Sequence, residues 1–403
     1  MVNMKILIAA PRFPYPLDKG DRLTIYNYLK YFHSIGFSVT LVVFYENDSE
    51  LDNIDKIEGF CEKLIPIKLK RTTAALNVIK NIFAKIPFQI SYYQNSEFKN
   101  TVNELVENGK YDLLYAHTIR MAPFIKNFHL PKVCAMQISM ALNYRRLKEK
   151  SSNIFMKIFY TLEWKLVKKF EHNITYYFDK CFLISKYDRD EIEKSGKELQ
   201  NIFYNPHGVD HVYFEPDLSV KKEKNTLIMT GNFGYYPNTD AILYFYNEIF
   251  PLVLEKIPDI KIYVVGKNPP SELQSLQSKN LVVTGMVDDL RPYLNKACIG
   301  IDPLRIGAGL QNKVIEAMSM ALPVVATSAA NEGIMAKDGS EILIADTIEE
   351  FAEKIIYLLN SESKQQELSK NARAFILREY TWEYFLNQLV DQFKIVIQSH
   401  NAA

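Results

Sequence analysis

Short apolar runs alternate with amphipathic stretches along the first half of the chain. The runs predict strands at Met4–Ala10, Phe37–Phe44, Leu113–Ala116 and Lys180–Ile184. The second run is continuous, as in a sheet that is covered on both faces. A helix is predicted over Arg22–Ser34, because Ile25, Leu29 and Phe32 recur at helical spacing. Residues 45–110 follow neither period closely enough for an assignment.

The same alternation starts again after Asn205–Asp217, a segment rich in turn residues. The predicted strands are Thr226–Thr230, Lys261–Val265, Leu281–Thr284, Cys298–Ile301 and Pro323–Ala326. The predicted helices are Thr239–Lys256, Asp289–Lys296, Gln311–Met320 and Ile348–Leu359. A final helix runs from Trp382 to Ile397, and its apolar stripe needs a surface to pack against.

Two successive βα repeats predict an α/β protein with two doubly wound, Rossmann-like sheets. We expect an N-terminal domain over residues 1–210 and a C-terminal domain over residues 211–380. The remaining residues, 381–403, are expected to form the last helix and to return to the N-terminal domain. In sheets of this kind ligands bind beyond the carboxyl ends of the strands.

Composition excludes several classes of protein. The chain has 403 residues, of which 48% are hydrophobic and 24% charged, so disorder is not its main character. The four cysteines form no C-x-x-C pair, and neither a disulfide framework nor a metal knuckle is expected. The run Met4–Ala10 ends at Pro11 without a cleavage site, and no stretch reaches the ~18 apolar residues of a membrane span. We expect a cytoplasmic protein, soluble or peripheral to the membrane.

Charge is divided unevenly along the chain. Residues 1–210 hold 30 Lys/Arg and 23 Asp/Glu, whereas residues 211–403 hold 18 and 24. The basic excess collects in Lys63–Lys85 and Ser151–Phe170, where lysines alternate with large apolar residues. Such helices are typical of proteins that contact an anionic membrane, but a core helix with a solvated lysine face has the same pattern. Both interpretations stay open, while nucleic acid is not expected because no nucleic-acid-binding module accompanies the patches.

The segment with the most chemical information is Pro303–Met318, PLRIGAGLQNKVIEAM, between a predicted strand and a predicted helix. Its glycines let the backbone approach a ligand, and the first N–H groups of a helix attract a diphosphate. Arg305 and Lys313 flank the turn and add positive charge. The Glu316 carboxylate is placed to accept hydrogen bonds from two vicinal ribose hydroxyls. A glycine-rich turn is also what any βα unit needs, so the segment alone leaves both interpretations open.

The block GAGLQNKVIEAMSMALPVVATSAANEGI resembles the nucleotide-sugar signature of family-4 glycosyltransferases. Three other segments resemble the bacterial subgroup associated with exopolysaccharide gene clusters: PRFPYPLDKGDRLTIYNYL, TGNFGYYPNTDAILYF and GMVDDLRPYLNKACIGIDPLR. The resemblance covers nearly the whole chain and is weakest between residues 45 and 110. It implies the GT-B fold, in which two Rossmann-like domains face a central cleft.

The resemblance also implies roles for individual residues. The residues implied to bind the nucleotide-sugar donor are Gly20, Gly231, Asn232, Val287, Gly309, Leu310, Gln311 and Glu316. Among them Val287 is expected near the base, the Leu310 and Gln311 amides at the diphosphate, and Glu316 at the ribose. The catalytic candidates are His117, which is similar to a histidine that touches the transferred sugar, and the cations Lys313 and Arg305.

Two positions depart from the pattern of the family. Ala308 stands where family members have a glutamate near the transferred sugar. Gly231-Asn232 replaces their Gly-Arg, so the usual phosphate arginine is missing. Arg305 and Lys313 are candidates to replace that arginine. Glu332 is a candidate sugar contact, with a plain turn residue as the alternative.

No metal ion or other cofactor is expected. Asp188-Arg189-Asp190 has the form of a D-x-D metal site, but Ser185 marks a helix start, and acidic residues in a first helical turn need no metal. His207 and His211 share a turn-rich segment without a convincing third ligand.

Together these observations predict a glycosyltransferase that moves a sugar from a UDP- or GDP-sugar to a glycan or polyprenyl-linked acceptor of cell-surface polysaccharide. The resemblance implies a retaining reaction without a metal. The basic first half is expected to face the acceptor at the inner side of the cytoplasmic membrane. Two alternatives stay open: a nucleotide-sugar epimerase of the same fold, and a non-catalytic nucleotide-sugar-binding scaffold, which Ala308 favours.

Overall fold

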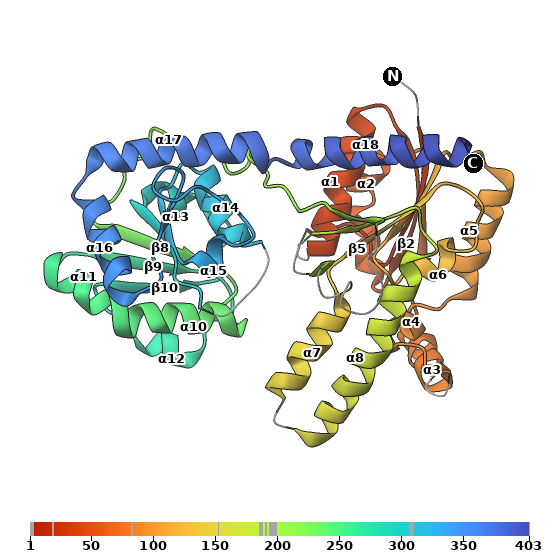
Figure 1. Cartoon of the computed structure of the whole chain (residues 1–403), viewed down its shortest axis with the longest axis horizontal. Helices are drawn as coiled ribbons and strands as arrows, with labels where there is room; N and C mark the ends of the chain where they lie inside the picture. The colour runs from red at the N-terminus through yellow and green to blue at the C-terminus, as the bar shows by residue number, and fades with distance from the viewer. Residues whose placement is uncertain are drawn as a thin grey trace. The chain divides into compact units, whose positions relative to one another are not determined.

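The computed structural model describes residues 4–17, 20–81, 84–151, 153–184, 188–189, 192, 200–305 and 310–402. The chain forms two compact units, one made of Met1–Pro206 with Phe385–Ala403 and the other of His207–Tyr384. Each unit is built on a parallel sheet flanked by helices (Figure 1). The predicted fold class, α/β with two Rossmann-like sheets, is therefore confirmed.

The sheet of the first unit has the strand order β3-β2-β1-β4-β5-β6-β7, and all its neighbouring strands are parallel. Its strands are β1 (Lys5–Ala10), β2 (Ser38–Tyr45), β3 (Lys63–Lys68), β4 (Leu113–His117), β5 (Lys132–Gln137), β6 (Lys180–Leu183) and β7 (Ile202–Tyr204). The chain fills one side of β1 first and then the other, so the order of strands reverses between β1 and β4. Such a switch point leaves a crevice at the carboxyl ends of the two strands.

Helices cover this first sheet. They are α1 (Gly20–Ser34), η1 (Asp48–Asn53), α2 (Asp55–Glu58), α3 (Arg71–Asn81), α4 (Phe88–Tyr92), α5 (Ser96–Asn108), α6 (Ala122–Ile125), α7 (Met140–Lys150), α8 (Ile154–Thr175) and most of α18 (Trp382–Asn401). Phe44 of β2 packs against Phe98 of α5 and Phe124 of α6 in the core between sheet and helices. Within the described residues, no helix combines the length and the apolar character that crossing a bilayer requires.

Residues 45–110, which the sequence pattern left unassigned, contain strand β3 and helices η1, α2, α3, α4 and α5. Strand β3 reads KLIPIK and lies at the edge of the sheet. Proline lacks the amide hydrogen that a central strand needs, and lysines are common on edges. Because of the proline and the lysines, this strand is not a continuous apolar run and could not be recognised by that criterion.

The sheet of the second unit has the order β10-β9-β8-β11-β12-β13, again parallel. Its strands are β8 (Thr226–Thr230), β9 (Lys261–Val265), β10 (Leu281–Gly285), β11 (Ile299–Asp302), β12 (Val324–Ala326) and β13 (Leu343–Ile344). Its helices are α10 (Tyr236–Tyr244), η2 (Phe245–Ile249), α11 (Phe250–Lys256), α12 (Ser271–Ser275), α13 (Arg291–Lys296), α14 (Asn312–Ser319), α15 (Ser328–Asn331), α16 (Ile348–Leu359) and α17 (Glu362–Glu379). The switch point of this sheet lies between β8 and β11.

The single helix expected over Thr239–Lys256 consists of three segments: α10, the π-helical η2 and α11. Pro251 lies in the first turn of α11. A proline inside a continuous α-helix removes one backbone hydrogen bond and collides with the preceding turn. The wider π-helical segment just before it accommodates this defect.

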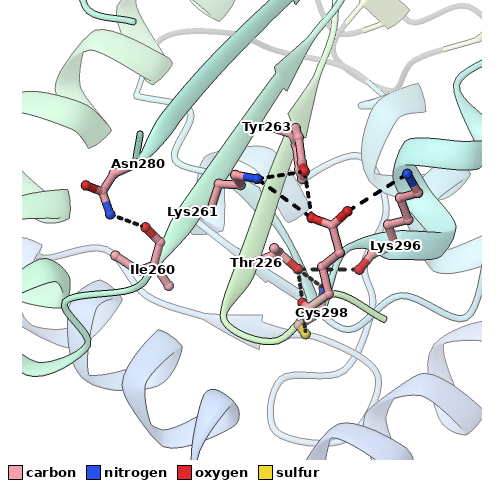
Figure 2. Close-up of polar contacts among 8 residues, drawn as sticks. Thr226, Ile260, Lys261, Tyr263, Asn280, Lys296 and Cys298 are labelled. Carbon is pink, nitrogen blue, oxygen red and sulfur yellow. Dashed lines mark hydrogen bonds and ion pairs between the residues drawn. The ribbon is translucent and has the colours of Figure 1, made fainter. Parts of the chain in front are cut away.

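A polar network ties the amino ends of the strands in the second unit (Figure 2). Glu223, just before β8, accepts a hydrogen bond from the Tyr263 hydroxyl at 2.6 Å and lies 3.9–4.0 Å from the ammonium groups of Lys261 and Lys296. The Thr226 hydroxyl accepts a hydrogen bond from the Cys298 amide at 3.1 Å, which joins β8 to the start of β11. These contacts join the amino ends of β8, β9 and β11, at the edge opposite to the one where ligands of doubly wound sheets bind.

Helix α18 packs its apolar stripe against the first unit. Phe393 is fully buried, and its ring lies 5.9–6.1 Å from the rings of Phe32, Tyr115 and Phe182. The Asn387 side chain accepts a hydrogen bond from the Tyr31 hydroxyl on α1. The C-terminal helix thus completes the core of the first unit rather than that of the unit that precedes it in sequence.

We expect Phe393→Ala to lower the free energy of unfolding of the first unit by about 3–5 kcal/mol, because the substitution leaves a cavity among three aromatic rings. Urea denaturation followed by circular dichroism measures this loss. Ile395→Ala is the matched control, since Ile395 lies on the exposed side of the same helix, and its effect should stay within about 0.5 kcal/mol. Equal effects of the two substitutions would contradict the packing described for α18.

Candidate functional site

A cavity of about 520 Å³ lies in the second unit at the carboxyl edge of its sheet. Its walls come from the ends of β8, β9 and β10, the loops that follow them, and the start of α14. This position adjoins the switch point between β8 and β11, where ligands of doubly wound sheets bind. The fold therefore places the cavity where sequence reasoning expects a nucleotide.

Two glycines let the backbone fold tightly at the base of the cavity. Gly231 after β8 and Gly266 after β9 have φ angles of +154° and +152°. A Cβ atom on Gly266 would come within 1.7 Å of the Gly231 carbonyl oxygen. No side chain fits at that crossing, so glycine at position 266 lets the ends of β8 and β9 approach each other beside the cavity.

Asparagines organise the loop that follows β8. Asn232 uses its side-chain oxygen to accept hydrogen bonds from the Gly234 amide at 3.1 Å and from Asn268 at 3.2 Å. The Asn238 amide group donates to the Asn232 carbonyl at 3.0 Å and accepts from Lys313 Nζ at 2.7 Å. Asn232 is therefore a turn-forming residue, and Asn238 links that turn to the lysine of α14.

Lys313 forms an ion pair with a buried carboxylate. Its Nζ lies 3.1 Å from Asp302 Oδ1, and the side chains of the two residues are only 10% and 1% exposed. Burial raises the pKa of Asp302, and the nearby ammonium group of Lys313 opposes that rise. Asp302 is the last residue of β11, so the pair fastens the start of α14 to the carboxyl edge of the sheet.

Glu316 lies one turn after Lys313 on the same face of α14 and lines the cavity. Its side chain is half-buried, and desolvation raises its pKa to about 7. The carboxyl group therefore titrates close to neutral pH.

The start of α14 forms part of the cavity wall. Leu310 and Gln311 line the cavity just before the helix begins at Asn312, and the first turn carries no acidic residue. A helix N-terminus carries about half a positive charge, which favours an anion at this end. Gly309, the neighbouring candidate, lies outside the described residues, as does Ala308.

The cavity brings together most of the residues predicted to bind the donor: Gly231, Asn232, Val287, Leu310, Gln311, Lys313 and Glu316. It does not include Arg305 or Glu332. The Arg305 guanidinium instead binds Asp240 at 2.7 Å and lies 4.3 Å from the centre of the Tyr244 ring. Glu332 is exposed at the end of α15.

Gly20 and His117 belong to the first unit, at its own switch point. Gly20 is the first residue of α1 rather than a loop residue. His117 ends β4 and is buried, with Nε2 3.3 Å from the Asp21 carbonyl oxygen. Burial lowers the pKa of His117 to about 4, so its imidazole is neutral at pH 7. Nδ1 has no hydrogen-bond partner among the described residues.

Several cavity residues escaped sequence reasoning, namely Tyr235, Asn238, Lys267 and the neighbouring Asp302. Lys267 is exposed, follows Gly266 directly and lines the cavity. Lysines are common after strands, so the sequence gives no reason to single out Lys267 as a ligand contact. Asp302 did carry a signal, because an acidic residue that ends the buried strand IGID needs a partner.

In the D-x-D segment, the structure describes Asp188 and Arg189, and Asp188 has a protein partner. Asp188 is buried, and its Oδ1 accepts a hydrogen bond from the Ser139 amide at 2.9 Å. Ser185 and Asp190 lie outside the described residues. The His207 ring stacks on Trp382, with 5.5 Å between the ring centres.

Residues 224–361 match the protein family described as Glycosyl transferases group 1. This match spans all the described walls of the cavity. Over nearly its whole length the chain is also similar to an uncharacterised 44.6 kDa protein in the cps region of Klebsiella pneumoniae. The two are 26% identical over 388 residues, which cover 93% of this chain and 96% of the relative.

Two further similarities complete the comparison. The capsular polysaccharide biosynthesis glycosyltransferase CapM of Staphylococcus aureus is 22% identical over 263 residues, which cover 59% of this chain and 69% of CapM. The crystal structure of Anabaena Alr3699/HepE in complex with UDP covers 97% of this chain and 100% of that chain, with a TM-score of 0.67 and 13% identity. At that identity the structural similarity supports the fold alone.

The ion pair between Lys313 and Asp302 makes a testable contribution to stability. We expect Lys313→Met to lower the free energy of unfolding by about 3–5 kcal/mol at pH 7, because it leaves a buried carboxylate without a counter-charge. An unpaired buried carboxyl group has a raised pKa in the folded state, so its destabilising effect is small at low pH and grows as the pH rises. Urea denaturation at about pH 5 and about pH 8 should therefore show the larger loss at the higher pH.

The double substitution Lys313→Met/Asp302→Asn is the control, because it removes both charges together. It should recover most of the lost stability and remove the dependence on pH. A double variant as unstable as Lys313→Met would mean that the buried charge is not the cause of the loss.

Proposed function

We propose a specific reaction for this chain, which is a glycosyltransferase of the GT-B fold and carries a glycosyl transferases group 1 domain at residues 224–361. It transfers a sugar from UDP-sugar to a glycan or lipid-linked acceptor of a capsular or related cell-surface polysaccharide. The observation that carries the proposal is the cavity where the start of α14, Lys313 and Glu316 meet. A glycan built on a lipid carrier is made at a membrane, so we also expect the enzyme to contact an anionic bilayer.

The names of similar proteins support the donor and the product. The relative in Klebsiella pneumoniae lies in a cps region, and CapM is named for capsular polysaccharide biosynthesis. The structurally similar HepE binds UDP. We therefore favour UDP over GDP as the nucleotide of the donor.

In this proposal the diphosphate of the donor lies at the start of α14. The amides of Leu310 and Gln311 donate hydrogen bonds to it, and Lys313 and Lys267 provide positive charge from two sides of the cavity. Asn232 stands where family members have a phosphate-binding arginine, and Lys267 provides the positive charge in its place. Arg305 does not, because its guanidinium binds Asp240. Gly20 remains a candidate diphosphate contact from the first unit, and Gly309 one from the turn before α14.

Glu316 binds the ribose in this arrangement. Its ionised carboxylate accepts hydrogen bonds from the two vicinal hydroxyl groups, while Val287 contacts the base. Tyr235 adds an aromatic ring to the wall of the cavity, although no contact in the structure assigns it to base or sugar.

The reaction proceeds with retention at the anomeric carbon and without a metal, as the resemblance to family-4 enzymes implies. When the bond from the sugar to the diphosphate breaks, negative charge develops on the β-phosphate. Donors that are already in position at that atom stabilise the charge without reorganisation, which is a large term in enzyme catalysis. Lys313 is such a donor, because Asp302 and Asn238 hold its ammonium group in one place. His117 stays a predicted sugar contact.

Calorimetric titration with UDP, GDP, ADP, TDP and CMP tests the nucleotide site. We expect binding of UDP, and we expect Glu316→Ala to weaken it by about 1.5–3 kcal/mol, the usual value of hydrogen bonds to a charged group. Glu332→Ala is the matched control, since Glu332 is exposed and outside the cavity, and should leave the affinity unchanged. Absence of binding by any of these nucleotides would contradict the proposal, and conversion of UDP-sugar to its epimer without an acceptor would identify an epimerase instead.

The same titration should depend on pH. Glu316 accepts hydrogen bonds from ribose best when ionised, and desolvation raises its pKa to about 7. The affinity for UDP-glucose should thus rise about tenfold between about pH 6 and about pH 8. UDP-glucose is the appropriate ligand because its diphosphate does not titrate in this range. A dependence that persists in Glu316→Ala would show that another group causes it.

Lys267 and Arg305 can be separated by experiment. We expect Lys267→Ala to weaken UDP binding by about 1–3 kcal/mol and to leave uridine binding unchanged, because the lost contact is to phosphate. Arg305→Ala should change UDP affinity by less than about 0.5 kcal/mol, since its guanidinium is held by Asp240. The reverse order of the two effects would restore Arg305 as the residue that replaces the missing arginine.

A further inference from the structure

Helices α7 and α8 form a hairpin that extends away from the sheet of the first unit (Figure 1). The two helices pack along each other. Glu171, near the end of α8, is buried and accepts hydrogen bonds from the Ser139 hydroxyl and the Met140 amide at 2.9 and 2.5 Å. This contact joins α8 to the start of α7 at the base of the hairpin, and the other end of the hairpin points away from the sheet (Figure 1).

The free end of the hairpin exposes large apolar side chains. Phe155 is 80% exposed, Ile154 62% and Leu162 57%. We call the following residues the hairpin tip: Leu147, Ile154, Phe155, Met156, Ile158, Phe159 and Leu162, all of which are exposed. Six of them fall within the first nine residues of α8. Soluble proteins rarely expose so many large apolar side chains together unless the surface binds something.

The hairpin tip faces outward because the opposite face of α8 is already in use. Ile154, Ile158 and Leu162 follow one another at four-residue spacing, so they share one side of the helix. Glu163 and Val167 lie on the other side and are buried. Glu163 there accepts a hydrogen bond from the Phe88 amide at 2.9 Å, which holds α8 against α4. The core interpretation therefore applies to the side of α8 that carries Glu163 and Val167, and not to the side that carries Ile154, Ile158 and Leu162.

Positive charge surrounds the hairpin tip. Residues 140–175 contain eight Lys/Arg and three Asp/Glu. Two of the three acidic residues, Glu163 and Glu171, are buried, so the surface of the hairpin is strongly basic. Lys157, Lys165 and Lys169 are exposed on α8, and Lys148 lies 4.9 Å from the centre of the Trp164 ring between the two helices.

We propose that the hairpin tip inserts into the interface of an anionic lipid bilayer, with the lysines of α8 in contact with lipid phosphates. Apolar side chains flanked by lysines are the chemistry that such an interface selects. A second copy of the chain is a poorer occupant, because its own hairpin would bring like charges together. This surface lies on the hairpin alone; its role rests on the proposed function, because it gives the expected membrane contact of that enzyme a defined place.

Flotation of the full chain with lipid vesicles tests the proposal. We expect binding to vesicles of phosphatidylcholine with phosphatidylglycerol, weak binding to phosphatidylcholine alone, and loss of binding at high salt. Ile154→Ser/Phe155→Ser should lower the binding about tenfold or more. Leu218→Ser/Val212→Ser is the matched control, since both residues are strongly exposed but belong to the second unit, and should bind like the unchanged chain.

Charge reversal tests the lysines separately. Lys157→Glu/Lys165→Glu should reduce binding to the anionic vesicles, whereas Lys256→Glu/Lys279→Glu, exposed in the second unit, should not. UDP affinity should be the same in every variant, so failure of the nucleotide site and failure of the membrane surface are distinguishable. Circular dichroism checks that each variant is folded.

Two outcomes would overturn the proposal. One is that the unchanged chain does not bind anionic vesicles, or that the hairpin variants bind them as well as the controls do. The other is a dimer that Ile154→Ser/Phe155→Ser converts to a monomer in sedimentation velocity, with vesicle binding unchanged. The second result would assign the hairpin tip to an interface between copies of the chain.

Discussion

The ion pair of Lys313 with Asp302 is the interaction on which the candidate site depends. A buried carboxylate is costly unless a counter-charge lies beside it, so β11 can end in Asp302 only if α14 begins where Lys313 reaches it. That requirement also brings Glu316 and the first amides of α14 to the same edge of the sheet. Asn238 then ties the lysine to the loop after β8. One buried charge thus positions the elements that build most of the cavity.

The same ion pair decides how an anion would be held. Asp302 offsets part of the charge on Lys313 and holds its ammonium group in place, so Lys313 alone attracts an anion only moderately. The remaining positive potential comes from the start of α14 and from Lys267, which are at different places on the wall. A ligand with two linked phosphates can use both, in agreement with the proposed diphosphate donor.

Sequence reasoning located the features that depend on local sequence, namely strands, glycine turns and the start of a helix. The strands and the glycines of the second unit follow from local pattern, and the segment around Lys313 and Glu316 was located correctly at the carboxyl edge. Sequence reasoning could not find contacts between side chains that are far apart in the sequence. Arg305 is next to the turn in the chain, yet its partner is Asp240 on α10, sixty-five residues away. Periodicity could not reveal that partner.

Other differences have equally local causes. Strand β3 escaped because Pro66 and its lysines obscure the apolar pattern of an edge strand. The stripe of α8 was found, but the pattern could not decide between core and membrane, because both need the same residues at the same spacing. Only the exposure of residues such as Phe155 shows which part of the surface of that helix lies outside the core.

A crystal structure of the chain with UDP-glucose is the decisive test of the nucleotide site. We predict a diphosphate within hydrogen-bonding distance, about 3 Å, of the Leu310 and Gln311 amides, with Lys313 and Lys267 beside it and the ribose hydroxyls at Glu316. A nucleotide bound in any other place, or one whose ribose faces away from Glu316, would contradict this prediction.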